Sequence, residues 1–166
     1  MSKFRGGFHE QTFNQRKKPF GSLAMRTLGD MYADLEQGAK NGLELHYDSV
    51  LKGREGITHR QKVRNQYLNI VDIPPVDGCD IITTIDVGMQ DIAEKALIDE
   101  LKEINGTVGV AILMEVKTGE IKAIVNMTKC NDGVYREIRN NAVSDMMEPG
   151  STFKTASIMV ALEDGY

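Results

Sequence analysis

The sequence contains no tryptophan, only two cysteines, and no apolar run as long as the roughly 18 residues of a membrane-spanning helix. Its first 18 residues are polar and lack the apolar centre of a secretory signal peptide. Hydrophobic residues make up 41% of the 166 positions and charged residues 27%. We therefore expect a soluble, globular chain as written, long enough for one domain or for parts of two.

The two cysteines, Cys79 and Cys130, do not have the spacing of a metal-ligand pair. They allow either a disulfide or two thiols, of which we favour two thiols, and we expect no metal or cofactor. All three histidines lie in the first part of the chain, and the last of them is His59. A Ser–His–Asp arrangement in the second half would therefore need a histidine from the first half.

Charge is distributed unevenly along the chain, whose net charge is −4. Residues 1–78 carry 12 basic and 9 acidic side chains, whereas residues 79–166 carry 8 basic and 15 acidic ones. This change coincides with the stiff Pro74-Pro75 segment and predicts two units, residues 1–76 and 77–166. The one basic cluster, Arg16-Lys17-Lys18, is too small to indicate a nucleic-acid partner.

In the first unit, residues 1–18 show no sustained period and are expected to form a loop or an edge strand. A short helix is expected over residues 22–28, capped by its serine and stopped by a glycine. Apolar residues at helical spacing predict a second helix over residues 43–52. Residues 67–73 have the composition of a strand that ends at the two prolines.

The second unit has clearer patterns. Alternation predicts a short strand over residues 80–85, and Asp86 is expected to cap a helix that ends at Asn105-Gly106. Residues 108–116 and 121–127 alternate as the two strands of a hairpin, turned at Lys117-Thr118-Gly119. The polar residues 128–149 are expected to form a long loop over a cleft. The helix is expected to bury one apolar stripe, which consists of Met89, Ile92, Ala93, Ala96, Leu97, Leu101 and Ile104.

The chain is organised around the run Glu148-Pro149-Gly150-Ser151-Thr152-Phe153-Lys154 and the apolar tract that follows it. Pro149 and Gly150 favour a turn, so that Ser151 begins a helix whose apolar faces predict burial. Lys154 lies three residues on and can reach the Ser151 hydroxyl. The positive helix N-terminus and burial both favour the neutral amine, which can take a proton from the serine. The Ser151 N–H, free at the helix start, can stabilise an oxyanion.

A Ser-x-x-Lys pair alone is a weak signal, because Ser49 and Lys52 form a second copy in the same chain. The complete run, followed by an apolar helix, is more specific. It resembles the active-site serine motif of the penicillin-binding proteins, the transpeptidases that cross-link peptidoglycan.

Three other parts of the chain resemble class B members of that family in the expected order. Thr83-Thr84-Ile85-Asp86 is similar to the start of the transpeptidase domain, and Arg139-Asn140-Asn141-Ala142-Val143 is similar to the approach to the serine helix. A run typical of the preceding non-catalytic pedestal domain comprises Gly42, Leu43, Glu44, Tyr47, Asp48, Leu51, Gly53 and Gly56. The Ser49–Lys52 pair falls within that run, and we interpret it as structural.

The resemblance implies an α+β fold. It comprises the end of a pedestal domain, then the first helix, the β-hairpin and the active-site helix of a transpeptidase domain. It also implies acyl transfer, with Ser151 as the nucleophile and Lys154 as its base. The implied partners are peptidoglycan stem peptides, β-lactam antibiotics and the cell-wall synthesis proteins of elongation or division. The implied location is the extracytoplasmic (periplasmic) face of the bacterial cytoplasmic membrane.

The sequence lacks several features of the family pattern. The family's second and third motifs and its membrane anchor are not found, and Lys117-Thr118-Gly119 precedes the serine in a hairpin turn. We therefore expect a fragment that lacks turnover by itself. Two alternatives stay open: a β-lactamase or β-lactam sensor of the same serine–lysine class, and a non-catalytic scaffold fragment.

Overall fold

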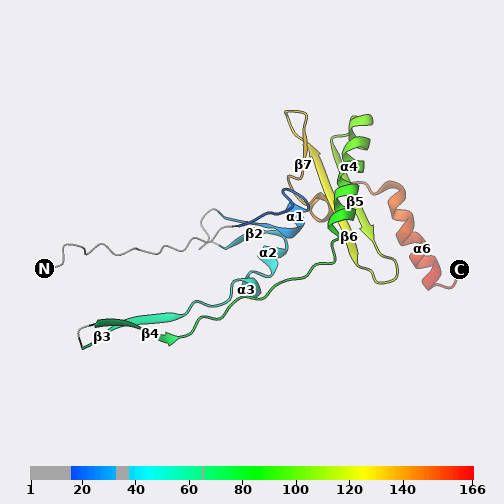
Figure 1. The fold of residues 1–166 in the computed structure, drawn as a ribbon. Helices are drawn as coiled ribbons and strands as arrows, with labels where there is room; N and C mark the ends of the chain where they lie inside the picture. Colours follow the sequence, from blue (N-terminus) through cyan, green and yellow to red (C-terminus); the bar gives the residue numbers. More distant parts are fainter. Residues whose placement is uncertain (1–15, 33–37, 65) are drawn as a thin grey trace.

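The computed structural model describes residues 16–32, 38–64 and 66–166. It has a body built around a three-stranded sheet, a long two-stranded arm on one side, and a helix near the C-terminus that stands away from the body (Figure 1). Helices and strands are interspersed along the chain, which agrees with the predicted mixture of helices and strands. The expectation for residues 1–18 falls almost entirely outside the described residues.

The elements of the first unit are short. They are α1 (Met25–Leu28), β1 (Asp30–Met31), β2 (Ala39–Asn41), α2 (Gly42–His46) and α3 (Asp48–Leu51). The first helix begins three residues later than predicted, because Ala24 adopts a left-handed conformation (φ 50°) after a series of turns. Gly29 ends it as expected. The second predicted helix is divided into α2 and α3 at Tyr47, whose backbone leaves the helical region (φ −108°, ψ 18°).

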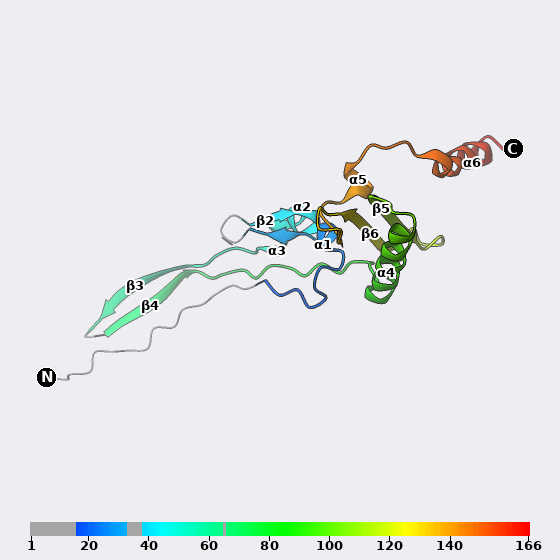
Figure 2. The same ribbon diagram turned by 90° about the horizontal axis from the view of Figure 1, so that it is seen from above.

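An antiparallel arm extends from this unit (Figure 2). It pairs β3 (Ile57–Val63) with β4 (Gln66–Ile73), so that Thr58 faces Val71 and Lys62 faces Tyr67. The strand predicted over residues 67–73 is confirmed as β4, whereas its partner β3 was not predicted. Every residue of β3 is exposed, and so is every residue of β4 except Ile70.

The two chain segments at the base of the arm lie close together. Arg54 and Val76 exchange backbone hydrogen bonds of 2.8 and 2.9 Å, and the Cys79 N–H donates to the Val50 carbonyl at 2.9 Å. A Cβ atom at Gly53 would lie 2.3 Å from the Val76 carbonyl oxygen, and one at Gly78 would lie 1.8 Å from that of Leu51. Only glycine fits at these two positions, because any side chain would separate the segments.

The strand predicted over residues 80–85 does not form. The structure gives these residues no strand partner, and Ile82 is 95% exposed. They run as an extended connection whose end is fixed by hydrogen bonds from Thr84 Oγ1 to the Ile121 carbonyl (2.8 Å) and from the Asp86 N–H to the Lys122 carbonyl (2.9 Å). Alternation alone predicts a strand, but a strand also needs a neighbouring edge with which to pair.

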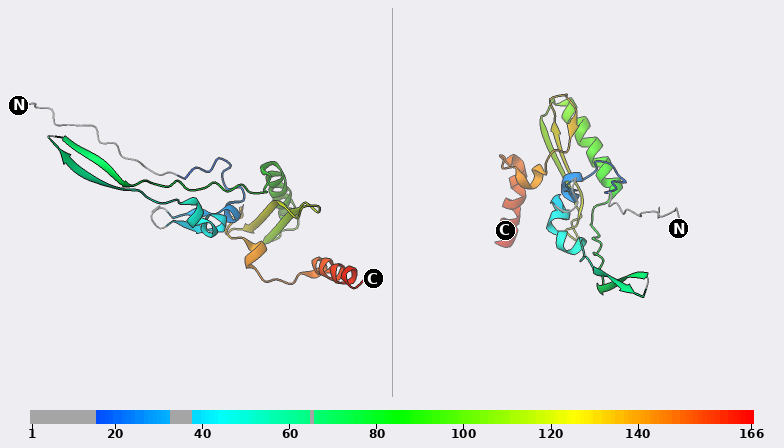
Figure 3. Two further views of the ribbon diagram at one scale, coloured as in Figure 1. Left: turned by 90° about the horizontal axis from the view of Figure 1, so that it is seen from below. Right: turned by 90° about the vertical axis from the view of Figure 1, so that its left-hand side faces the viewer.

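The body is a sheet in the order β5-β6-β7, with α4 on one of its sides and α5 and α6 on the other (Figure 3). Strands β5 (Val108–Met114) and β6 (Ile121–Lys129) form the predicted hairpin, and β7 (Tyr135–Arg136) pairs with the end of β6. Helix α4 (Val87–Glu103) begins where predicted, because the Asp86 carboxylate accepts a hydrogen bond from the Met89 N–H at 2.8 Å.

The buried face of α4 differs from the predicted stripe. Leu101 joins Val125, Met127 and Tyr135 in the core, and Ala93, Leu97 and Ile98 pack against them. Leu101, Ala93 and Leu97 were predicted, but the other four residues of the stripe are exposed: Ala96, and Met89, Ile92 and Ile104 at 45%, 69% and 62%. The rotation of the helix is fixed by Gln90, which is 1% exposed and exchanges two 2.8 Å hydrogen bonds with the backbone of Ile124.

Residues 128–149 are more ordered than the predicted loop. They contain β7 and a short helix, α5 (Asn141–Ser144), on the approach to Ser151. Both elements are too short to produce a periodic pattern in the sequence. The placement of this segment over a cleft stays a prediction.

The connection between β4 and α4 should be the first site of limited proteolysis. Residues 79–85 have no regular structure and expose Ile82, whereas α4 is packed on the sheet. Thermolysin or proteinase K should therefore cut between residues 79 and 85 before it cuts within α4, as followed by mass spectrometry of the early fragments. Early cleavage within residues 90–101 would contradict the division into two units.

Candidate functional site

Ser151 and Lys154 lie on one continuous helical segment. The 3₁₀ helix η2 (Gly150–Phe153) contains Ser151, and α6 (Lys154–Glu163) follows it directly, beginning with Lys154. Gly150 opens the segment in a left-handed conformation with φ 53°. The predicted helix start and the three-residue spacing are therefore present, and both side chains are exposed.

The two side chains are three residues apart on the helix, but no hydrogen bond joins them. Within residues 16–32, 38–64 and 66–166, neither Ser151 nor Lys154 has a side-chain hydrogen bond or an ion pair. In the same residues, the Ser151 N–H donates to no backbone carbonyl, whereas the N–H of Thr152 donates to Pro149 at 3.2 Å. The Thr152 hydroxyl also donates to the Pro149 carbonyl, and this contact closes the turn.

The expectation that α6 is buried is wrong for this structure. No residue of α6 is buried, and Ile158, Met159 and Leu162 are 59%, 66% and 69% exposed. The apolar sequence predicts a helix that other protein covers on nearly every side. In this structure α6 stands apart from the sheet, so the sheet does not cover it (Figure 1). Ser151 and Lys154 therefore face solvent.

Helix α5 attaches the serine segment (residues 139–163) to the body through polar contacts. The Ala142 N–H donates to Asn126 Oδ1 at 2.8 Å, and Asn141 Nδ2 donates to Thr128 Oγ1 at 3.1 Å. Both acceptors belong to β6. Arg139 braces the same segment through Asn141 Oδ1 at 3.0 Å and an ion pair with Asp145 at 3.0 Å.

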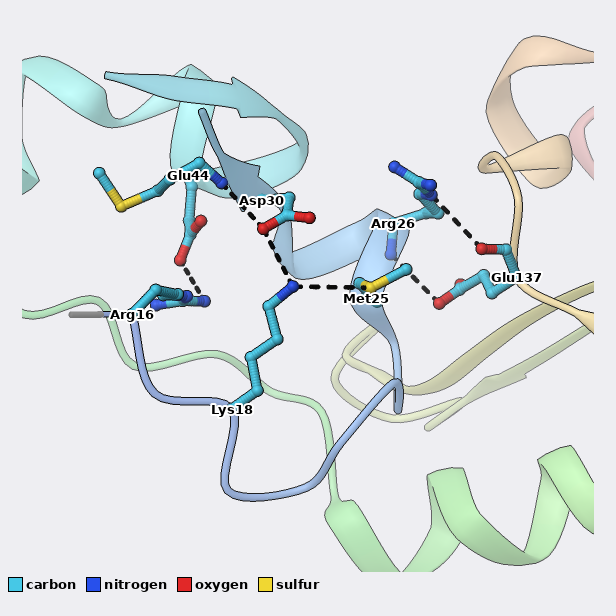
Figure 4. Close-up of polar contacts among 8 residues, drawn as sticks. Arg16, Lys18, Met25, Arg26, Asp30, Glu44 and Glu137 are labelled. Atoms are coloured by element: carbon cyan, nitrogen blue, oxygen red, sulfur yellow. Dashed lines mark hydrogen bonds and ion pairs between the residues drawn. The ribbon is translucent and has the colours of Figure 1, made fainter. Parts of the chain in front are cut away.

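Glu137 connects this region to the first unit (Figure 4). Its carboxylate accepts a hydrogen bond from the Arg26 N–H of α1 at 3.1 Å, and its backbone carbonyl accepts from Arg26 Nε at 3.4 Å. Asn126 Nδ2 lies 3.5 Å from the other carboxylate oxygen. The residue is only 7% exposed, and burial raises the pKa of its carboxyl, while the hydrogen bonds from Arg26 and Asn126 act in the opposite direction.

A cleft of about 410 Å³ lies beside this junction, away from Ser151. Glu94 of α4 lines it together with Glu137, and burial, with the nearby Asp91, raises the pKa of the Glu94 carboxyl. Among the described residues, no group of three or more His, Cys, Asp or Glu side chains is arranged to hold a metal ion. None of the helices described is long and apolar enough to cross a membrane.

The other sequence motifs lie where structural roles were expected. Ser49 is on α3 of the first unit, and Lys52 follows at its end. Lys117-Thr118-Gly119 forms the β5–β6 turn, in which the Gly119 N–H and the Thr118 hydroxyl both donate to Glu115 at 2.8 Å. Cys79 and Cys130 are free thiols, as favoured from the sequence.

Comparison with known proteins identifies the family. A profile of the penicillin-binding protein transpeptidase domain matches residues 109–166. A probable peptidoglycan D,D-transpeptidase, PenA of Neisseria meningitidis, is 30% identical over 163 residues, which cover 91% of this chain and 27% of that protein. The chain belongs to the penicillin-binding protein transpeptidases. The resemblance stated from the sequence is thereby confirmed.

Two further relatives support the assignment. The peptidoglycan D,D-transpeptidase FtsI of Escherichia coli is 27% identical over 168 residues, covering 96% of this chain and 28% of that protein. The crystal structure of a peptidoglycan synthetase from Bifidobacterium adolescentis superposes with a TM-score of 0.71 at 25% identity, covering 92% of this chain and 29% of that one. The chain thus spans little more than a quarter of the length of these relatives.

Asn126 and Glu137 were not identified from the sequence. Asn126 falls in the strand predicted over residues 121–127, at a position that alternation assigns to the outward face. Its burial depends on α5, which has no periodic pattern. The one signal that could have found it is a polar residue between Val125 and Met127, both core residues.

Replacing Glu137 should change how stability depends on pH. Because the folded-state pKa of this carboxyl is raised, the folded protein binds its proton more tightly than the unfolded chain does. The resulting contribution to stability is fully present below the unfolded pKa and is lost as pH rises through the folded one. As pH falls from 7 to 5, the free energy of unfolding should therefore increase in the unmodified protein. It should increase less in the Glu137→Gln protein.

Urea unfolding at both pH values measures this difference. Asp132 does not interfere, because Arg136 holds its pKa at about 2, below the range tested. Glu103→Gln, an exposed change on α4, serves as the control and should behave as the unmodified protein does. An equal gain in the Glu137→Gln protein would contradict the prediction.

Proposed function

We propose that this chain contributes the nucleophile and the general base of a peptidoglycan D,D-transpeptidase. The observation that carries the proposal is the position of Ser151 at the start of a helix, one turn from Lys154, within the region that matches the transpeptidase domain. The relatives are named peptidoglycan D,D-transpeptidases, which favours this function over a β-lactamase or a β-lactam sensor.

In the proposed reaction, Ser151 Oγ attacks the carbonyl carbon between the two D-alanines of a stem peptide. Lys154 accepts the hydroxyl proton and passes it to the departing amine of the terminal D-alanine as the C–N bond breaks. An amine from a neighbouring stem peptide then attacks the acyl-serine ester. A new amide forms, and the proton returns to Ser151. A β-lactam follows the first half of this sequence, and its opened ring stays attached to the serine.

The start of the helix offers a backbone N–H group that could stabilise the negative charge formed in the reaction. A developing oxyanion needs donors that are already oriented, and the Ser151 N–H has no backbone acceptor among the described residues. The lysine acts as a base only when its amine is neutral, which a covered site favours. Because α6 is exposed, we infer that further protein surface has to cover Ser151 and Lys154 before the reaction is efficient.

The proposed partners and location follow from the same assignment. The substrates are peptidoglycan stem peptides, and β-lactams compete with them at Ser151. Peptidoglycan is assembled outside the cytoplasmic membrane, so we place the reaction on the extracytoplasmic side, together with cell-wall synthesis proteins of elongation or division. Residues 1–76 and 77–166 would serve as pedestal and catalytic parts.

The assignment of the nucleophile can be tested with a fluorescent penicillin. In a protein that carries this chain at the relatives' full length, Ser151→Ala should abolish covalent labelling. Ser49→Ala is the matched control, because Ser49 belongs to the second Ser-x-x-Lys pair, and it should label normally. Lys154→Ala should fold but acylate roughly 10²–10⁴-fold more slowly, because the hydroxyl loses its base. Normal labelling of the Ser151→Ala protein would refute the assignment.

The need for a covered site gives a second test. The 166-residue chain should acylate far more slowly than the full-length protein, because its Ser151 and Lys154 face solvent. Stopped-flow or gel-based labelling of both proteins at equal penicillin concentration measures the ratio, and a D-Ala–D-Ala thioester tests turnover. Comparable rates would show that α6 needs no further cover.

A further inference from the structure

We propose that Asn126 and Glu137 are positioning residues for the acylation of Ser151. They hold the segment that leads to the serine against the sheet and link it to helix α1 of the first unit. This inference rests on the proposed function, because it concerns the same serine. Neither residue lies on the serine helix, and neither is assigned a chemical step.

Asn126 is a polar side chain in a completely buried position. It lies on the central strand β6, between Val125 and Met127, and its exposed fraction is 0%. Burying an amide without hydrogen bonds is unfavourable, so its partners determine what it contributes. Its oxygen accepts from the Ala142 N–H at 2.8 Å, and its nitrogen lies 3.5 Å from Glu137 Oε1. Both ends of the amide are therefore occupied.

Glu137 continues the connection on the other side. Its second carboxylate oxygen accepts from the backbone N–H of Arg26 in α1 at 3.1 Å. A path of three hydrogen bonds thus runs from Arg26 through the Glu137 carboxylate and the Asn126 amide to the backbone of Ala142. Figure 4 shows the α1 end of this path, where Glu137 approaches Arg26. The path joins the two units and ends in α5.

The serine segment has few other attachments to the body. After Asp145, the side-chain hydrogen bonds of the described residues are local, from Thr152 to Pro149 and from Ser157 to Phe153. No residue of α6 is buried. The polar contacts that tie this segment to the sheet therefore lie upstream of Ser151, where Asn126 contacts Ala142 and Asn141 contacts Thr128.

Each link in this path has a fixed direction, which makes it testable. Asn126→Asp keeps the acceptor for Ala142 but places a second carboxylate against Glu137. Glu137→Gln keeps an acceptor for Arg26 but turns an NH₂ group towards the Asn126 NH₂. The double variant restores every link, because the carboxylate introduced at position 126 then accepts both from the Ala142 N–H and from the amide introduced at position 137. The two singles should be impaired and the double variant should recover.

The experiment measures penicillin acylation in the full-length protein at saturating and subsaturating concentrations. Each single variant should lower the acylation rate constant by about tenfold or more while leaving the non-covalent affinity within about threefold, since small displacements of a nucleophile slow its chemical step. The double variant should return the rate constant to within about threefold of the starting protein. Loss that is additive in the double variant would overturn the proposal.

A matched control separates positioning from loss of stability. Gln90 is equally buried and exchanges two hydrogen bonds with β6, but it holds α4 rather than the serine segment. Gln90→Leu should lower the melting temperature by as much as the singles do and leave the acylation rate constant unchanged. If Gln90→Leu slows acylation as much as Asn126→Asp does, the effect is general destabilisation and the inference fails.

A second measurement uses the 166-residue chain and does not depend on enzymatic activity. Hydrogen–deuterium exchange of the backbone amides in residues 139–145 should be faster in both single variants and return to the original rate in the double variant. Unchanged exchange in the singles would overturn the inference even if Ser151 is the nucleophile. If the full-length protein is not labelled at Ser151 at all, the proposed function fails, and the exchange experiment still decides whether the path holds the segment.

Discussion

The packing of α4 against strand β6 is the interaction on which the rest of the structure depends. Strand β6 pairs with β5 on one edge and β7 on the other, and Ala123, Val125 and Met127 are almost completely buried. Leu101 and Leu97 of α4 fit against this surface because Gly109 of β5 has no side chain, and a Cβ there would lie 2.9 and 3.0 Å from them. The Tyr135 hydroxyl completes the contact, lying 3.0 and 2.7 Å from the carbonyls of Leu101 and Gly106. Strands β5 and β7 and helices α4 and α5 all contact β6.

The two sides of β6 are joined to their neighbours by different kinds of interaction. The side that faces α4 is apolar, which gives stability without strict direction. The side that faces α5 uses Asn126 and Thr128, whose hydrogen bonds fix direction and distance. A serine that has to meet a substrate carbonyl benefits from the second kind, because its position must be set more narrowly than the stability of a core requires.

The sequence predicted the structure correctly where a single local pattern determines it. The β5–β6 hairpin follows from strict alternation, and the start of α4 follows from Asp86, whose carboxylate caps it. It failed where the outcome depends on a distant partner. Residues 80–85 alternate but have no adjacent edge. The helix stripe was only partly correct, because Gln90 turns α4 towards Ile124, which buries Ala93, Leu97 and Leu101 but leaves the other predicted residues exposed. For the site, the Ser151–Lys154 spacing was predictable, but the attachment through Asn126 and Glu137 was not, since it joins residues from three separate segments.

The exposed apolar surfaces explain why a correctly spaced pair is not by itself a catalytic site. Met89 and Ile92 on α4, and Ile158, Met159 and Leu162 on α6, lie on opposite sides of the sheet and are all at least 45% exposed. Apolar side chains at such density normally face other protein. On α6 this has a chemical consequence. Cover that buries these apolar side chains would also remove water from around Ser151 and Lys154, which the proposed acyl transfer needs. Under the proposed function, one surface would therefore both cover α6 and shield its serine from water.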